Sequence, residues 1–199
     1  LVKAGCPLVF KGGTALMLIL GKSAHRLSID IDLICPPGTN IEDYLKSFAD
    51  FGFINLELVE RKQRDDADIP KSHSKFFYQI AYRNDTDAQS YILLDVLYED
   101  IHYFRTQQIA INCPFIRLEG KPLMVTVPSA EDILGDKLTA FAPNTTGIPY
   151  YKNGRSCSME IAKQLYDVGR LFENVSDLQI TKEAFRKIAV VELSYRSFG

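Results

Sequence analysis

Apolar residues recur along this chain with two different periods. Up to about residue 127, short runs alternate apolar and polar side chains at every second position, which is typical of strands with one buried face. From Pro128 onward, apolar residues recur every three or four positions, which is typical of amphipathic helices. We therefore expect an α/β fold, with a mixed sheet and flanking helices in a core domain, residues 1–127, and a mainly helical C-terminal domain, residues 128–199.

The first predicted strand leads directly into a pair of glycines. The apolar run at residues 8–10 is followed by Gly12-Gly13, which lets the backbone turn sharply and approach a ligand closely. Thr14 is expected to cap a short helix over residues 15–20, and Gly21 is expected to end it. The N-terminus of such a helix directs free N–H groups at an anion, so this turn predicts a phosphate cradle.

The second predicted strand, residues 29–34, carries two carboxylates on one face. Asp30 and Asp32 alternate with Ile29, Ile31 and Leu33, so the aliphatic side chains share the opposite face. Like charges side by side on a strand are unfavourable, and a divalent cation removes that penalty. Oxygen-only ligands favour Mg²⁺ or Mn²⁺. The alternative is an ordinary edge strand whose aspartates are solvated.

Further strands and one helix are predicted before residue 128. Asn40 or Thr39 is expected to cap a helix through Ile41, Tyr44, Leu45 and Phe48, which share a face at helical spacing. The charged run 61–68 reads as a solvated loop rather than a calcium loop, because the EF-hand glycine and terminal glutamate are absent. Strands are expected at residues 54–60, 108–112 and 124–127. Two more, at 75–82 and 90–98, are expected to form an antiparallel hairpin around turn residues 84–87.

Asp95 is the only charged residue inside the apolar run 90–98. A carboxylate buried in a strand needs a hydrogen-bond partner, an opposite charge or a cation. Asp95 is therefore a candidate third carboxylate beside Asp30 and Asp32. The alternative is an aspartate near a strand end that is hydrogen-bonded to backbone.

Three helices and a long loop are expected after residue 127. Ser129 is the predicted cap of a helix that runs to Phe141, with Asp132 at the capping-box position. Loop 142–155 contains aromatic and basic residues, so Tyr150 or Tyr151 can stack on a base, although a merely mobile loop fits equally well. A helix is expected over residues 158–172. Its apolar stripe consists of Ile161, Leu165, Val168 and Phe172, with Leu171 beside it. A last helix is expected to begin at Thr181.

Composition favours a soluble globular protein. The chain has 199 residues, is 46% hydrophobic and 24% charged, and carries a net charge of −2. That charge argues against a nucleic-acid coat protein but not against a local basic groove. We see no apolar run long enough to cross a membrane and no secretory signal, so we expect a cytoplasmic location. The chain opens on Leu1 rather than methionine, so we expect an upstream segment.

The cysteines give no sign of a disulfide framework or a zinc site. They are scattered, without a Cys-x-x-Cys pair or a histidine at zinc spacing, so unpaired thiols in a reducing compartment are expected for Cys6, Cys35, Cys113 and Cys157.

The glycine turn and the paired aspartates together resemble a known signature. Gly-Gly-Thr, a short helix and Asp-x-Asp on a strand are similar to the opening of the DNA-polymerase-β-like nucleotidyltransferase superfamily. The fuller string, residues 11–16 with Arg26, Ser28 and residues 30–33, resembles the AbiEii/AbiGii toxin nucleotidyltransferases of type IV toxin–antitoxin systems. The Gly-Lys-Ser at residues 21–23 lacks the upstream glycine of a Walker A loop.

This resemblance implies roles for individual residues. Asp30, Asp32 and Asp95 are the implied ligands of two Mg²⁺ (or Mn²⁺) ions, and Asp95 is also the candidate general base. Arg26 and Lys137 would neutralise charge on the phosphates. By chemistry alone Arg26 fits a solvated surface arginine equally well, and Lys137 fits an exposed helix lysine better. The implied nucleotide ligands are Lys11, Gly12, Gly13, Thr14, Arg26, Ser28 and Lys137.

Two helical segments resemble the later motifs of the same family. Residues 136–140 are similar to an acidic-Lys-Leu motif that brings a lysine to the triphosphate. Residues 163–168 are similar to the closing motif Arg-Asp-Leu-Tyr-Asp-Leu, but Lys163 and Gln164 replace its first two residues. Asp167 matches the motif and is implied either in acceptor handling or in a structural role.

The implied function is metal-dependent transfer of a nucleoside monophosphate from a nucleoside triphosphate (NTP) to an acceptor hydroxyl, with release of pyrophosphate. The resemblance implies a toxin that a cognate antitoxin restrains and whose acceptor is tRNA or another RNA. The basic loop residues Lys152 and Arg155 are candidates to contact an RNA backbone. One alternative is a nucleotidyltransferase that modifies a small molecule or a protein. The other is a non-catalytic module that binds a nucleotide or a partner protein.

Overall fold

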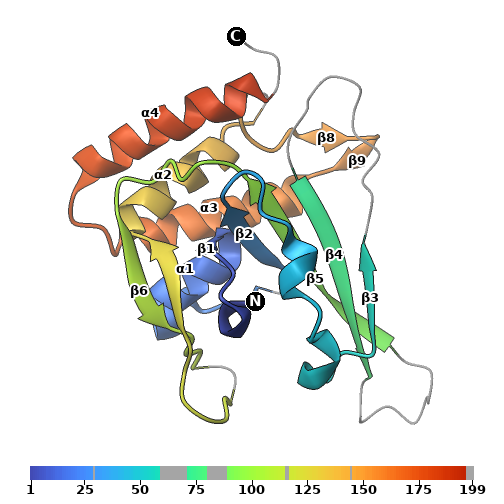
Figure 1. The fold of residues 1–199 in the computed structure, drawn as a ribbon. Coiled ribbons are helices and arrows are strands. Elements are labelled where there is room, and N and C mark those ends of the chain that lie inside the picture. The colour runs from blue at the N-terminus through green and yellow to red at the C-terminus, as the bar shows by residue number, and fades with distance from the viewer. Residues whose placement is uncertain (29, 59–70, 80–88, 115–116, 144, 196–199) are drawn as a thin grey trace.

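The computed structural model describes residues 1–28, 30–58, 71–79, 89–114, 117–143 and 145–195, and contains a mixed α/β fold as the sequence predicts. Its central sheet has seven strands in the order β3-β4-β5-β2-β1-β7-β6, with helices packed around it (Figure 1). The strands of this sheet are β1 (Val9–Lys11), β2 (Ile31–Cys35), β3 (Asn55–Leu58), β4 (Lys71–Gln79), β5 (Gln89–Tyr98), β6 (Thr106–Ala110) and β7 (Met124–Pro128). The helices are α1 (Gly12–Leu20), α2 (Ala130–Ala140), α3 (Ser158–Phe172) and α4 (Leu178–Ser194).

The middle of the sheet combines parallel and antiparallel pairs. β2 lies between β1, to which it is antiparallel, and β5, to which it is parallel. The predicted β4–β5 hairpin is confirmed as an antiparallel pair, although its turn lies outside the described residues. β2 begins at Ile31, so Asp30 precedes the strand rather than lying within it as predicted. Ile29 is outside the described residues.

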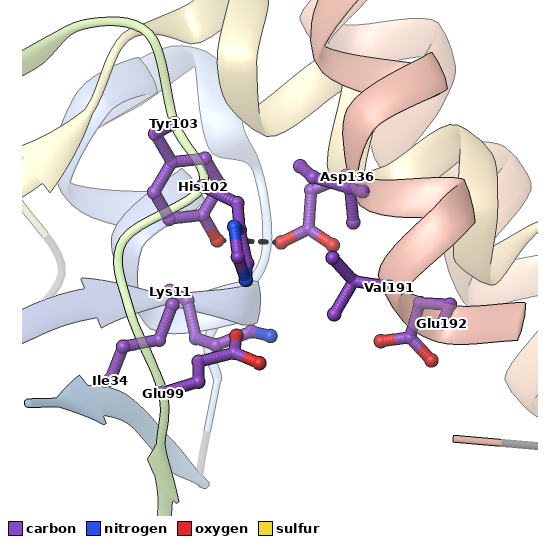
Figure 2. Close-up of a pocket in the computed structure, with 9 residues that line it drawn as sticks. Lys11, Ile34, Glu99, His102, Tyr103, Asp136, Val191 and Glu192 are labelled. Carbon is purple, nitrogen blue, oxygen red and sulfur yellow. Dashed lines mark hydrogen bonds between the residues drawn. The ribbon is translucent and has the colours of Figure 1, made fainter. Parts of the chain in front are cut away.

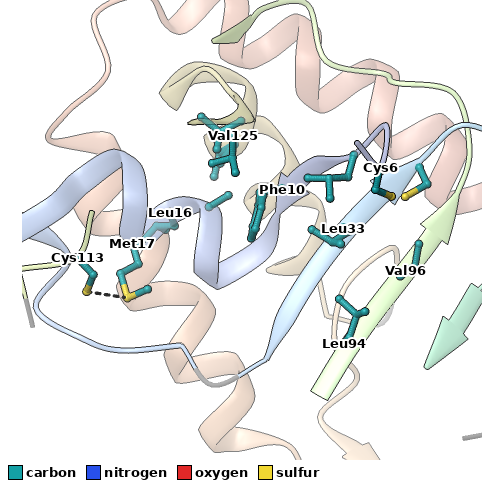
Figure 3. Packing of buried hydrophobic residues seen from close by; sticks show 14 of the residues in the cluster. Cys6, Phe10, Leu16, Met17, Leu33, Leu94, Val96, Cys113 and Val125 are labelled. Atoms are coloured by element: carbon teal, nitrogen blue, oxygen red, sulfur yellow. Dashed lines mark hydrogen bonds between the residues drawn. The ribbon is translucent and has the colours of Figure 1, made fainter. Parts of the chain in front are cut away.

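Each face of the sheet has its own apolar cluster. On one face Phe10, Leu33 and Val96 pack with Leu16 and Met17 of α1 in the main core (Figure 3). On the other face Val9, Ile34 and Tyr103 pack with Ile188 of α4. Because neighbouring strand residues point to opposite faces, the side chains of Lys11, Asp32 and Asp95 belong to the α4 face.

The first helix begins three residues before the position predicted from Thr14. α1 starts at Gly12 with Lys11 at the N-cap position, and it ends at Gly21 as predicted. Thr14 is not the cap: its hydroxyl donates a 2.6 Å hydrogen bond to the backbone oxygen of Asp30. Thr14 therefore fixes the segment before β2 against the first turn of α1.

The segment after β2 forms two short 3₁₀ helices, Ile41–Tyr44 and Phe48–Phe51, rather than the single helix predicted. Asn40 caps the first of them through its side chain, and Ile41 and Leu45 are buried in the main core, so the predicted cap and face are confirmed. Within the predicted strand 54–60, the structure describes strand β3 over Asn55–Leu58. Its last two residues, the charged run 61–68 and residues 80–82 of the next predicted strand lie outside the described residues.

The C-terminal half contributes α2, α3 and α4. Ser129 caps α2 as predicted, but its backbone N–H donates to the backbone oxygen of Arg105 rather than to Asp132, so Asp132 does not complete the capping box. Asp132 has another role. Its buried carboxylate accepts hydrogen bonds from the backbone N–H groups of Phe104 (2.7 Å) and Arg105 (3.0 Å), so it anchors the segment before β6. α4 begins at Leu178, capped by Asp177, rather than at Thr181. The division of the chain at residue 127 stays a prediction.

The helix α3 has the bounds that the sequence predicts but a different buried face. Leu171 is buried, whereas Leu165 and Phe172 of the predicted stripe are 56% and 59% exposed. The stripe is wrong at these two positions because the face turned toward the protein carries Asp167, which is fully buried.

The predicted loop 142–155 contains a small hairpin of β8 (Tyr151–Lys152) and β9 (Arg155–Ser156). Asn153 and Gly154 form its turn with φ of 53° and 76°, the left-handed conformation that an Asn-Gly pair favours in a two-residue hairpin.

All four cysteines are buried and unpaired, as predicted. None of the helices in the described part of the chain is long and apolar enough to span a bilayer.

Candidate active site

Two carboxylates lie side by side at the centre of the sheet. In the parallel pair of β2 and β5, Asp32 is the register partner of Asp95. Neighbouring strands are about 4.8 Å apart, and partners in register share a face. Both side chains are half-buried, between the apolar residues that precede and follow them. The sequence prediction that Asp95 joins Asp32 from a neighbouring strand is therefore consistent with the observed register.

The glycine turn lies directly against Asp32. Gly12 has φ of +64°, and a Cβ atom built on it would overlap the Asp32 carboxylate, with Cγ only 2.8 Å away. A Cβ atom on Gly13 would lie 2.7 Å from Ser28 Oγ and 3.0 Å from Arg26 Nη2. The positive φ and the close approach favour glycine at position 12, whereas a side chain at position 13 would have to displace the side chains of Ser28 and Arg26. The turn thus brings the N-terminus of α1 together with an acidic and a basic side chain.

Asp30 occupies a different environment from Asp32. It is exposed and precedes β2, and its backbone oxygen accepts hydrogen bonds from Thr14 Oγ1 and from Ser28 Oγ (3.3 Å). Within the described residues, no three carboxylate, imidazole or thiol groups lie close enough to hold a metal ion as they stand. The role of Asp30, Asp32 and Asp95 as a set of metal ligands stays a prediction.

The electrostatics of Asp32 fit a cation. Burial raises the pKa of Asp32, and the neighbouring charges of Asp95 and Asp30 raise it further, while Lys11 and Lys137 act in the opposite direction. The net result is a pKa above the usual value. A divalent cation would relieve both the repulsion and the desolvation, and oxygen ligands of this kind are those that Mg²⁺ prefers. The residues present therefore fit the predicted ion.

Arg26 and Lys137 converge on one buried carboxylate, that of Asp167. Arg26 donates two hydrogen bonds to it, at 2.7 Å from Nε and 2.6 Å from Nη2, in a bidentate geometry. Lys137 Nζ lies 3.0 Å from Asp167 Oδ2. Burial alone would raise the pKa of Asp167, but these two cations outweigh burial and lower it. Asp167 therefore holds two of the predicted phosphate ligands in one cluster.

Lys11, the last residue of β1, points between acidic side chains (Figure 2). Burial lowers the pKa of Lys11, but the charges of Asp136, Glu99 and Glu192 outweigh burial and raise it. Asp136 is itself held by a 2.8 Å hydrogen bond from the hydroxyl of Tyr103. The positive charge of Lys11 is thus already balanced by neighbours in the chain, and its predicted role as a nucleotide ligand is untested.

A cavity of about 190 Å³ adjoins these groups. Its charged lining consists of two lysines and two carboxylates, Lys11, Lys137, Asp136 and Glu192, and Gln164 and the segment Thr146–Ile148 also line it. Lys137 Nζ donates a 3.1 Å hydrogen bond to Gln164 Oε1 at its wall. The exposed hairpin β8–β9 lies further along the same segment of chain, with Tyr150 and Tyr151 54% and 72% exposed.

Sequence reasoning missed three acidic neighbours of Lys11. Asp136, Glu99 and Glu192 come from α2, the end of β5 and α4, and only the folded chain brings them together. Of these, Asp136 alone carried a signal, as the acidic residue that precedes Lys137. Gln164 was visible only as a departure from a motif, and its contact with Lys137 is a finding of the structure.

Comparison with known proteins agrees with the reading of the sequence. The family model described as "Nucleotidyl transferase AbiEii toxin, Type IV TA system" matches residues 1–195. No curated protein sequence matches the chain. Among solved structures, JHP933 from Helicobacter pylori is 18% identical with a TM-score of 0.46, over 97% of this chain and 86% of that one. MenT4, a nucleotidyltransferase toxin from Mycobacterium tuberculosis H37Rv, is 12% identical with a TM-score of 0.42, over 94% of this chain and 84% of that one.

Proposed function

Because the chain belongs to the AbiEii nucleotidyltransferase toxin family of type IV toxin–antitoxin systems, we propose that it transfers a nucleoside monophosphate from an NTP to a hydroxyl group of RNA, with tRNA as the first candidate. The observation that carries the proposal is the pairing of Asp32 with Asp95 on neighbouring strands, directly beside the glycine turn. A cognate antitoxin protein is the partner that would restrain this activity.

The chain supplies a candidate base and the candidate ligands of a cation for this reaction. The acceptor oxygen attacks the α-phosphorus, the bond from the α-phosphorus to the bridging oxygen of the β-phosphate breaks, and pyrophosphate leaves. Asp95 is the candidate base that takes the proton of the acceptor hydroxyl. A divalent cation such as Mg²⁺, held by Asp30, Asp32 and Asp95, would supply positive charge that stabilises the reacting phosphate and lowers the pKa of the hydroxyl.

The phosphates of the NTP have a set of candidate donors in this chain. The backbone N–H groups of Gly12 and Gly13 open α1, where the helix dipole favours an anion, and Thr14 and Ser28 border the same turn. Arg26 and Lys137 lie on Asp167, where their charge can stabilise the pyrophosphate as it leaves. Lys11 lines the same cavity as Lys137, but its acidic neighbours already balance its charge.

The hairpin β8–β9 favours RNA as the acceptor. Tyr150 and Tyr151 expose aromatic rings on which a base can stack, and Lys152 and Arg155 expose positive charges that can contact a phosphate backbone. A small-molecule acceptor would need no such exposed surface. We therefore place the RNA at the hairpin and its reacting hydroxyl near Asp95.

Transfer of label tests the proposal directly. The protein is incubated with each α-labelled NTP, Mg²⁺ and total RNA, and we expect label on RNA together with released pyrophosphate. Asp30→Asn should abolish transfer while the melting temperature is unchanged, because Asp30 is exposed. Asp50→Asn, the same change at an exposed residue away from the site, should transfer at the wild-type rate.

Other outcomes decide between the alternatives. Label on a protein or a small molecule in place of RNA would contradict the proposed acceptor but keep the nucleotidyltransferase mechanism. Binding of NTP without any transfer would contradict the mechanism and identify a non-catalytic nucleotide-binding module. An Asp30→Asn variant with full activity would remove Asp30 from the metal site.

A further inference from the structure

Four polar residues stand in one row across the middle of the sheet. Lys11 of β1 is the register partner of Asp32 of β2, and Asp32 is in turn the register partner of Asp95 of β5. On the other side of β5, Asp95 has a second register partner, His73 of β4. The sequence alone gives His73 no role, because its position opposite Asp95 follows only from the pairing of β4 with β5.

The backbone places His73 on the same face of the sheet as Asp95. Register partners share a face, and successive residues of a strand alternate between faces. Ser74, the next residue of β4, is buried and its partner Leu94 belongs to the main core, so His73 belongs to the opposite, α4 face. Directly opposed residues of an antiparallel pair have Cβ atoms about 4.5–5.5 Å apart, a separation that a hydrogen bond between an imidazole and a carboxylate can span.

The surroundings of Asp95 in the sheet contain few hydrogen-bond donors. Its other register partner, Asp32, only accepts hydrogen bonds when it is ionised, and the residues two before and two after Asp95 on β5 are leucines. The diagonal positions on β4, Lys71 and Lys75, are farther away, at about 7–8 Å. His73 is therefore the directly opposed residue that can donate to Asp95, since a neutral imidazole carries one N–H donor.

We propose that His73 is a positioning residue for the candidate metal site: its imidazole N–H donates a hydrogen bond to the Asp95 carboxylate and holds it in the orientation that binds the cation. The row then has a basic side chain at each end, Lys11 beside Asp32 and His73 beside Asp95. Metal-binding side chains are commonly fixed by such a second hydrogen bond, and its loss weakens metal binding about 10- to 100-fold. The inference rests on the proposed function, because it requires Asp95 to be a metal ligand.

Binding of Mn²⁺ tests the inference without requiring turnover. The EPR signal of free Mn²⁺ measures the affinity, in the presence of a non-hydrolysable NTP whose phosphate oxygens complete the coordination. His73→Ala should weaken Mn²⁺ binding at least about tenfold, because the Asp95 carboxylate loses its donor. An amide also carries N–H donors, so His73→Asn or His73→Gln, whichever reaches Asp95, should bind Mn²⁺ within about threefold of the wild type.

A second histidine provides the control. His25→Asn removes a histidine from an exposed turn, where asparagine tolerates the positive φ of 50°, and it should bind Mn²⁺ like the wild type. Melting temperatures separate metal binding from folding. Mn²⁺ should raise the melting temperature of His73→Ala less than it raises that of the wild type, because a weaker ligand stabilises the folded state less.

Three results would overturn the inference. The first is wild-type Mn²⁺ affinity in His73→Ala, and the second is a loss in both amide variants as large as that in His73→Ala. The third is a pulsed EPR signal from a nitrogen bound directly to Mn²⁺ in the wild type but not in His73→Ala, which would make His73 a ligand. Each leaves the proposed function standing, because the wild type still binds Mn²⁺ and transfers the nucleotide. A wild type that binds no Mn²⁺ would contradict the metal site of the proposed function as well.

Discussion

A single buried carboxylate, Asp167, is bonded to two cations that come from distant parts of the chain. Arg26 belongs to the segment between α1 and β2, and Lys137 belongs to α2. Both cations are themselves largely buried, with side chains 20% and 10% exposed. Removing the carboxylate would leave both without a counter-charge, and uncompensated buried charges are strongly unfavourable.

Asp167→Asn should therefore lower the free energy of unfolding by about 3 kcal/mol. Chemical denaturation measures it. Glu173→Gln is the matched control, because Glu173 forms an exposed ion pair with Arg170, and it should change stability by less than about 0.5 kcal/mol. Equal stability of Asp167→Asn and the wild type would mean that the cluster contributes nothing to the fold.

The wild type and Asp167→Asn should also differ in how their stability changes at acid pH. Because the folded state lowers the pKa of Asp167 below its usual value of 3.8, the stabilisation is present above that pH and is lost as pH falls through the lower, folded-state pKa. Over the range below about pH 4, the wild type should lose stability more steeply than Asp167→Asn. Parallel curves would contradict the lowered pKa.

At the scale of elements, local periodicity predicted the strand faces well and the helix faces less well. Asp32 could be assigned to the polar face of its strand because the two-residue alternation is a local property, whereas Asp95 was identified as the one charge inside an apolar run. The stripe on α3 failed at Leu165 and Phe172, since the face of a helix that is buried depends on what it packs against. Here that face includes Asp167, whose partner Arg26 lies 141 residues away.

One element, the hairpin β8–β9, could have been predicted from the sequence but was not. Asn153-Gly154 is the strongest short signal for a two-residue hairpin, and the hairpin β8–β9 follows from it. The start of α1 at Gly12 could not be predicted from propensity, because glycine is a poor helix former and its place here follows from its close approach to Asp32 in the folded chain. The contacts of Lys11 with Glu99 and Glu192 depend on the fold as a whole.

Packing between α2 and α4 gives the sharpest test at this scale. A Cβ atom on Gly135 would lie 2.7 Å from Ala184 Cβ and 2.8 Å from the backbone nitrogen of Phe185. Gly135→Ala should therefore force the two helices apart and destabilise the protein by about 2 kcal/mol. Thermal or chemical unfolding measures the change.

Gly169→Ala on α3 is the matched control, because nothing lies within 4 Å of its Cβ position. In an open helical position alanine stabilises relative to glycine by up to about 1 kcal/mol. Opposite signs for the two glycine variants are expected. Equal effects would mean that the close approach of α4 to α2 does not exist in solution.

At the scale of the whole molecule, the fold brings together groups from both halves of the chain. Asp32, Asp95 and the glycine turn come from the sheet, whereas Lys137 and Asp167 come from α2 and α3. α4 completes the arrangement, since Ile188 packs on the sheet beside Tyr103 (Figure 1) and Glu192 lines a separate small pocket with Lys11 (Figure 2). The predicted α/β architecture with helices after residue 127 is what allows this convergence.

The rate of pyrophosphate release by Asp95→Asn, with NTP, Mg²⁺ and the RNA acceptor present, tests the central claim most directly. Glu57→Gln, a charge removal at an exposed position of β3, is the control and should match the wild type. The pairing of Asp95 with Asp32 predicts a fall of at least about a hundredfold for Asp95→Asn, with the fold retained. A wild-type rate in that variant would contradict the assignment of these two strands as the catalytic centre.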